Sequence, residues 1–239
     1  MSDICTVKKS TLDGIAEAIQ SKTGESGGML PSEMAGKIEA LPSQPAKGLV
    51  FSDYDSDGYP HKAEFVGTWA VIPQNYLYYY QNKGVSSFMG KVTRLVIPNG
   101  VTSIAMGAFQ SCSQLKEIIM PHNNLTVASL GFHSCSSVTS YHFFENLTIT
   151  GSQAFDGATN LTQLIVDGNL SQITNQCFRY ASKLELLDLS HCTAIPTLYS
   201  TASLGHANGC VIKVPSALLT DWQNATNWSA LTNVTWQGV

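Results

Sequence analysis

The chain has 239 residues, of which 44% are hydrophobic and only 13% are charged, against roughly 25% charged in an average soluble domain. This composition supports a packed core, and 13 basic against 17 acidic residues give a net charge of −4, which leaves no positive field to attract nucleic acid. The apolar runs fall short of the ~18 residues that span a bilayer, so we expect no membrane insertion. The opening MSDICTVKKS lacks the apolar stretch of a secretory signal.

Residues 1–45 are predicted to form a helical hairpin. One helix follows a cap at Ser10 and Thr11, and a second begins at Pro31 and ends at Pro42. Helices this short cannot support a core alone. We therefore expect this segment to be an anchoring module that packs on the rest of the chain, on copies of itself in a homo-oligomer, or on another protein.

Residues 53–64 match the spacing of a calcium loop. The matching residues are Asp53, Asp55, Asp57, Gly58 and Glu64, whose carboxylates would offer oxygen ligands. However, the flanking GLVF and EFVG are typical of strands, not of the helices that such a loop requires. A β-hairpin that turns at the Asp-Gly pair explains the same residues. We predict the hairpin, with bound calcium as the alternative, and expect no metal or other cofactor.

An internal repeat of 23 residues dominates the middle of the chain. Phe109, Phe132, Phe155 and Phe178 follow one another at this step, and two further apolar columns keep the same step. Those columns are Leu95, Ile118, Tyr141, Leu164 and Leu187, and Ile97, Met120, Phe143, Val166 and Leu189. A period of this length indicates stacked units that bury their apolar faces against one another.

Each unit contains one segment of alternating pattern, such as VTRLVIP at 92–98, which predicts a short strand. Weaker matches lie 32 residues before the regular units and 25 residues after them. Seven strands are therefore expected, ending near residues 65, 97, 120, 143, 166, 189 and 214. We predict an α/β fold in which residues 46–215 form a solenoid with a parallel β-ladder on one face.

Residues 216–239 are predicted to form a helical cap. A helix beginning near Pro215 or Ser216 would turn Leu218, Leu219 and Trp222 toward the last unit, because an uncovered terminal repeat exposes its core. Trp228 and Trp236 are expected to complete this cap.

Cysteine and histidine give no sign of a catalytic or metal site. Cys112 and Cys135 share one repeat position with Ala158 and Ala181, so we interpret the position as a small buried slot and the cysteines as thiols. The six histidines lack zinc-like spacing with cysteine, and no phosphate loop or nucleophile motif is present. We predict no catalytic residue.

Two surfaces are candidates for binding. The outward column between the two buried ones contains Val96, Ile119, His142, Ile165, Asp188 and Lys213. Its three β-branched apolar residues are a potential contact patch, although aligned Val and Ile also simply favour strands. The second candidate is Tyr78, Tyr79 and Tyr80 in an insertion at 78–91, because tyrosine provides large, rigid contact area.

The repeats resemble a known family. IPNGVTSIAMGAFQSCSQLKEIIMP, LTITGSQAFDGATNLTQLIV and ITNQCFRYASKLELLDL are similar to the BspA-like (type 5) leucine-rich repeats of bacteria, over about residues 60–214. The resemblance implies a leucine-rich-repeat solenoid that binds other molecules without catalysis. Residues 11–42, and more weakly 55–73 with the ending VPSALLTDWQNATNWS, resemble parts of tail-associated proteins of phages and prophages of Gram-positive bacteria.

Together these resemblances imply a virion protein of a phage tail, baseplate or tail fibre. Its solenoid would recognise a protein or glycan receptor on a bacterial surface, or another virion subunit, and residues 1–45 would bind other virion subunits. The alternative is a cell-surface or secreted bacterial adhesin that binds host matrix proteins, for which a signal or wall anchor would be expected.

Overall fold

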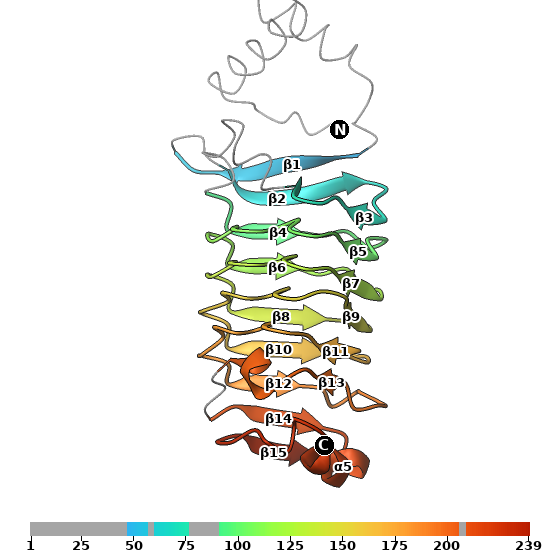
Figure 1. The fold of residues 1–239 in the computed structure, drawn as a ribbon. Coiled ribbons are helices and arrows are strands. Elements are labelled where there is room, and N and C mark those ends of the chain that lie inside the picture. Colours follow the sequence, from blue (N-terminus) through green and yellow to red (C-terminus); the bar gives the residue numbers. More distant parts are fainter. Residues whose placement is uncertain (1–46, 57–59, 77–90, 206–208) are drawn as a thin grey trace, which may run out of the picture.

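The computed structural model describes residues 47–56, 60–76, 91–205 and 209–239. The predicted helical hairpin and Tyr78, Tyr79 and Tyr80 lie outside these ranges. The described part begins with an antiparallel hairpin of β1 (Lys47–Tyr54) and β2 (Pro60–Gly67). This hairpin forms one end of a stack of strands (Figure 1).

The stack contains a main ladder of parallel strands that starts at β2. In order, the further strands are β4 (Arg94–Val96), β6 (Glu117–Ile119), β8 (Ser140–Phe143), β10 (Gln163–Val166), β12 (Leu186–Asp188), β14 (Val211–Val214) and β15 (Thr235–Gly238). The seven predicted strands are all present, and the 32-residue and 25-residue steps are confirmed by the pairs Ala63↔Leu95 and Leu187↔Ile212. We call each turn of the chain from one of these strands to the next a coil.

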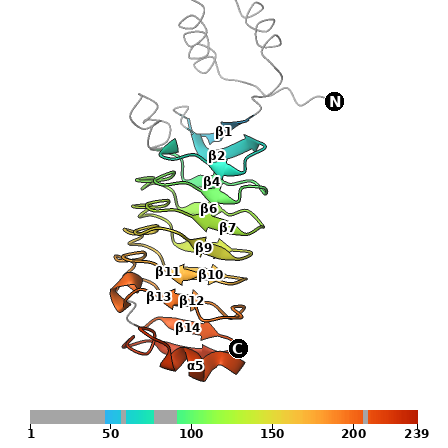
Figure 2. The same ribbon diagram turned by 45° about the vertical axis from the view of Figure 1, so that its right-hand side comes forward.

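A second, shorter set of strands runs beside the main ladder (Figure 2). Its members are β3 (Val71–Ile72), β5 (Ser103–Ile104), β7 (Leu125–Val127), β9 (Leu147–Ile149), β11 (Gln172–Ile173) and β13 (Thr197–Leu198). β3, β5, β7 and β9 form one parallel sheet, and β11 pairs with β13. The remainder of each coil is mostly turn, so the predicted α/β class narrows to a β-solenoid with little helix.

A file of phenylalanine rings runs through the interior. Phe109, Phe132, Phe155 and Phe178 are fully buried, and successive ring centroids lie 5.0, 5.4 and 5.0 Å apart with interplanar angles of 15° or less. The 23-residue period therefore places equivalent rings directly above one another. Apolar burial of this kind is the main stabilising term for coils that could not fold alone.

Asparagine side chains tie the coils together at the turn after each main-ladder strand. The Asn99 side-chain oxygen accepts the His122 N–H at 2.8 Å, that of Asn146 accepts the Asn169 N–H at 2.7 Å, and that of Asn169 accepts the Thr193 N–H at 2.8 Å. These contacts satisfy backbone donors that the turns leave outside the ladders.

The C-terminal end is closed by a mixed cap, which corrects the helical cap expected from the sequence. A 3-10 turn (η2, Ser216–Leu218) leads into a six-residue helix, α5 (Leu219–Asn224). The chain then returns as β15, which adds another parallel strand to β14. Trp222 and Trp228 are buried here, with ring centroids 4.9 Å apart. A further 3-10 turn, η1 (Thr201–Leu204), lies in the preceding coil.

Side chains of the cap also cover the exposed end of the second strand set. The Trp228 indole N–H donates to the Pro196 carbonyl at 2.8 Å, and the Asn227 amide donates to the carbonyls of Leu198 and Tyr199 at 2.7 and 3.1 Å. An edge strand whose carbonyls are already bonded is a poor template for pairing with another chain.

The five cysteines in the described part are free thiols and are buried. Burial raises the pKa of Cys112 to about 12 and that of Cys177 to about 12. Ala158 and Ala181 in the equivalent slot of later coils are also fully buried. The slot is therefore a packing position, as the sequence indicated.

Candidate binding surface

The outward face of the main ladder contains the predicted column. The strand registers pair Val96 with Ile119, His142 with Ile165, Ile165 with Asp188, and Asp188 with Lys213. All six side chains are partly exposed. The structure thus brings these residues into one row, and their role in binding stays a prediction.

The charged side chains on this ladder face pair with one another. Glu117 lies 2.8 Å from Arg94, Asp167 lies 2.8 Å from His142, and Lys213 lies 3.5 Å from Asp188, in each case between neighbouring coils. Within β2, Lys62 binds Glu64 at 2.9 Å. Exposed pairs such as these contribute little to stability, but they leave the face nearly neutral.

The main ladder is interrupted once, between β6 and β8. These two strands belong to separate sheets, and no backbone hydrogen bond joins them. Their spacing is visibly wider than that of the other neighbouring strands (Figure 1). On the other side of the same coil, β7 and β9 remain paired through Leu125↔Leu147 and Val127↔Ile149. The coils therefore open as a wedge on the ladder face alone.

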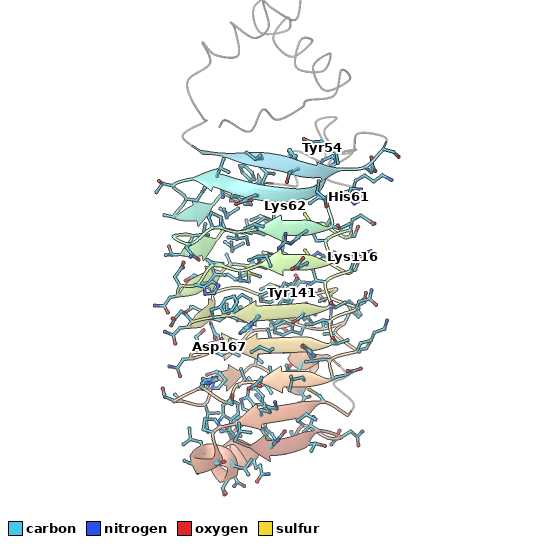
Figure 3. All side chains as sticks on the ribbon, turned by 180° about the vertical axis from the view of Figure 1, so that it is seen from behind. Tyr54, His61, Lys62, Lys116, Tyr141 and Asp167 are labelled. Carbon is cyan, nitrogen blue, oxygen red and sulfur yellow. The ribbon has the colours of Figure 1, made fainter. Side chains whose placement is uncertain are left out.

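A cleft of about 320 Å³ occupies this opening. It runs along the strands from Lys116 and Thr139 at one end to Met120 and Phe144 at the other, with Ile119, Ser140 and His142 between them. Figure 3 shows Lys116 and Asp167 at opposite ends of the strands. Only Ile119 and His142 of this lining were predicted as binding residues from the sequence.

An aromatic stack closes one end of the cleft. The Phe144 ring lies between the rings of His122 and His142, with centroid distances of 3.8 and 4.2 Å. The His142 Nε2 is also 2.8 Å from the Asp167 carboxylate. Phe144 stands where other coils have proline, and this substitution was the signal that the sequence offered.

Tyr141 accounts for the opening. It occupies the inward column, in which the neighbouring coils have Ile118 and Leu164, and its ring packs at 5.6 Å from Phe132 and 5.0 Å from Phe155. Burial, followed by the adjacent Cys135, raises the pKa of the Tyr141 phenol. A side chain larger than its neighbours in a close-packed interior forces surrounding segments apart.

A buried ion network lies outside the ladder face. The Asp156 carboxylate, 1% exposed, accepts hydrogen bonds from the Arg179 guanidinium at 2.6 and 3.3 Å and from the Gln153 amide at 3.2 Å. The carboxylate raises the pKa of Arg179. These contacts join adjacent coils, so we assign them a structural role.

The predicted hairpin at residues 53–64 is confirmed. β1 and β2 pair from Lys47↔Gly67 to Tyr54↔Pro60, which places Glu64 opposite Val50 and away from the turn. Glu64 binds Lys62, and Asp55 lies 3.3 Å from His61. Asp57 and Gly58 lie outside the described residues. Among the residues that the structure covers, no three His, Cys, Asp or Glu side chains gather as metal ligands would.

A neutral groove of about 410 Å³ lies at the C-terminal cap, lined by residues that include Tyr199 and Asn227. Tyr199 is 62% exposed, but its carbonyl already binds Asn227. In the described part of the chain, helices are too short or too polar to cross a bilayer.

Stacked coils of one fixed period, each with a strand in the ladder and an apolar residue in the central file, define a leucine-rich-repeat solenoid. Residues 84–200 match, in six copies, the family described as BspA type Leucine rich repeat region. The repeat region of this chain is therefore a BspA type leucine-rich repeat region.

One solved structure that resembles the chain is a leucine rich cell surface protein from Faecalibacterium prausnitzii A2-165. The two are 14% identical, with a TM-score of 0.24, over 63% of this chain and 61% of the other. The chain thus spans less than two thirds of that protein's length. No curated protein matches the sequence.

Proposed function

We propose that this protein is a non-enzymatic interaction module that binds a protein partner through the ladder face. The observation that carries the proposal is the composition of this face. Val96, Ile119 and Ile165 offer apolar contact area, and the surrounding charges are already paired within the chain. An apolar centre with a polar rim is the usual anatomy of a protein interface.

The self-paired charges favour a partner with a neutral contact surface. A strongly charged partner would have to compete with ion pairs such as Arg94–Glu117 and His142–Asp167. Electrostatic steering would accordingly add little to the association rate, and binding would depend weakly on salt.

The location that we favour is the bacterial cell surface or the extracellular space. The family match over residues 84–200 supports an adhesin-type role. The virion assignment rests on the resemblance of residues 11–42 and 55–73, and no comparison adds to it. We keep attachment to a phage particle through residues 1–45 as the alternative proposal.

Binding of the labelled full chain to immobilised host matrix proteins and to purified Gram-positive cell walls tests the proposal. Ile119→Lys and Ile165→Lys place a charge at the centre of the face and should weaken binding at least about tenfold, as loss of an interface anchor does. The matched control is Val71→Lys, because Val71 is an exposed apolar residue of β3 in the second strand set. An equal loss in the control, or no loss in the two ladder variants, would refute a role for this face.

A further inference from the structure

The cleft between β6 and β8 exposes backbone groups that every other gap of the main ladder hides. Glu117 and Ile119 direct their backbone groups to β4, as the bonds Glu117 N–H to Thr93 and Ile97 N–H to Ile119 show. Alternate residues of a strand point their N–H and C=O to opposite sides. Ile118 therefore faces β8, and by the same alternation Ser140 and His142 face β6. Hydrogen-bond donors and acceptors line both walls.

The remaining lining is mixed in character. Ile119 and Phe144 supply apolar surface, and Ser140 supplies a hydroxyl group. The Lys116 ammonium stands at one end, and it makes no ion pair with any residue that the structure describes. An occupant must therefore be apolar along its length and able both to donate and to accept hydrogen bonds. A purely apolar group would leave buried backbone groups unpaired, which is costly.

The size of the cleft limits its occupant. At about 320 Å³ it lies at the lower end of the range for small-molecule pockets. β6 and β8 are too close for another strand to enter, since some of their residues remain near neighbours. One large side chain of a partner fits these limits. The cleft also lies near the middle of the main ladder (Figure 1), where interface anchors concentrate.

Among the side chains that anchor interfaces, Trp, Tyr and Arg predominate. Lys116 disfavours an arginine, and an indole can only donate. A phenol both donates and accepts, and its oxygen can accept from Lys116. We infer that the β6–β8 cleft is an anchor pocket for a tyrosine side chain presented by a protein partner. This inference rests on the proposed function, because it specifies how the ladder face holds its partner.

Titration of the isotope-labelled full chain with N-acetyl-tyrosinamide, followed by amide NMR, tests the inference. The amides of residues 116–120 and 139–144 should shift and saturate together. N-acetyl-phenylalaninamide should bind about threefold to tenfold more weakly, because it lacks the hydroxyl group. N-acetyl-argininamide should bind more weakly still. Shifts scattered over the surface, or no shift up to the solubility limit, would overturn the inference. Preferential binding of N-acetylglucosamine would overturn it in favour of a glycan site.

Two variants locate the site. Ser140→Trp fills the cleft and should abolish the tyrosinamide shifts, whereas Gln163→Trp, in the same column of the next coil over a paired ladder, should leave them unchanged. Tyr141→Leu restores the residue type of neighbouring coils. It should let β6 pair with β8, slow hydrogen exchange of the Ile118 and Ser140 amides, and remove binding. Undiminished binding in both Ser140→Trp and Tyr141→Leu would refute the site.

The outcomes separate this inference from the proposed function. If tyrosinamide does not bind but Ile165→Lys still abolishes partner binding, the anchor pocket is refuted and the interaction face stands. If tyrosinamide binds the cleft while the ladder variants leave partner binding intact, the proposed function fails and the cleft is a separate ligand site.

Discussion

The phenylalanine file predicts that equivalent residues of successive coils contribute unequally to stability. Phe155 packs against four rings, those of Phe132, Phe178, Tyr141 and Phe143, at centroid distances of 5.0 to 6.0 Å. Phe178 has one such neighbour among the described residues, Phe155. Replacement by leucine keeps most of the apolar volume and costs less than about 1.5 kcal/mol for the change in shape. Each lost ring pair adds about 0.5–1.5 kcal/mol.

Because neighbouring contacts do not add fully, we expect Phe155→Leu to cost about 3 kcal/mol and Phe178→Leu about 1.5 kcal/mol. Urea unfolding followed by circular dichroism measures both values. The double variant should show a coupling of about 0.5–1.5 kcal/mol for the shared ring pair. Equal losses in the two single variants, or an absent coupling, would contradict the view that the stacked rings act as a continuous file.

Three further variants test other parts of the fold. The folded-state pKa of Cys112 is raised from 9.0 to about 12, so its contribution is complete below pH 9 and declines as the pH rises toward 12; in urea unfolding, Cys112→Ala should remove about 1.4 kcal/mol of the loss per pH unit in that window. Trp228→Phe should cost about 1–3 kcal/mol in melting experiments by leaving the Pro196 carbonyl unbonded; Trp222→Phe should cost less, because the Trp222 indole N–H has no partner in the described part. Gly151→Ala would place a Cβ 2.6 Å from the Ser129 backbone nitrogen and should lower stability by about 1–3 kcal/mol; an unchanged melting temperature would mean that the two coils can separate at no cost.

The repeat was predictable because stacking demands the same residue type at the same position of each coil. The steps from Phe109 to Phe178 and from Leu95 to Leu187 reveal the coil length and the inward columns directly. Positions at the ends obey no such demand. β15 and the three-part C-terminal cap were therefore not distinguished from a helical cap, although the inward tryptophans were identified.

The ladder opening was missed for a related reason. The period continues unchanged from Ile118 to Tyr141, so spacing alone gives no sign of a break. Only side-chain size changes there, and its effect depends on how tightly the surrounding rings pack. The inward Tyr141 and the Phe144 in place of proline were visible in the sequence, but their consequence required the three-dimensional arrangement.

The asparagine contacts between coils bear on how the protein can be produced. Asn146 and Asn160 each begin an Asn-Leu-Thr triplet, which the oligosaccharide-transferring enzymes of a eukaryotic secretory pathway modify at the side-chain nitrogen. In the folded chain that nitrogen of Asn146 donates to the Asn124 side chain at 2.8 Å, and that of Asn160 donates to the Ser136 carbonyl at 2.9 Å. Sugar attached before folding would occupy the gap between coils, so expression in such a host would set modification against assembly of the solenoid.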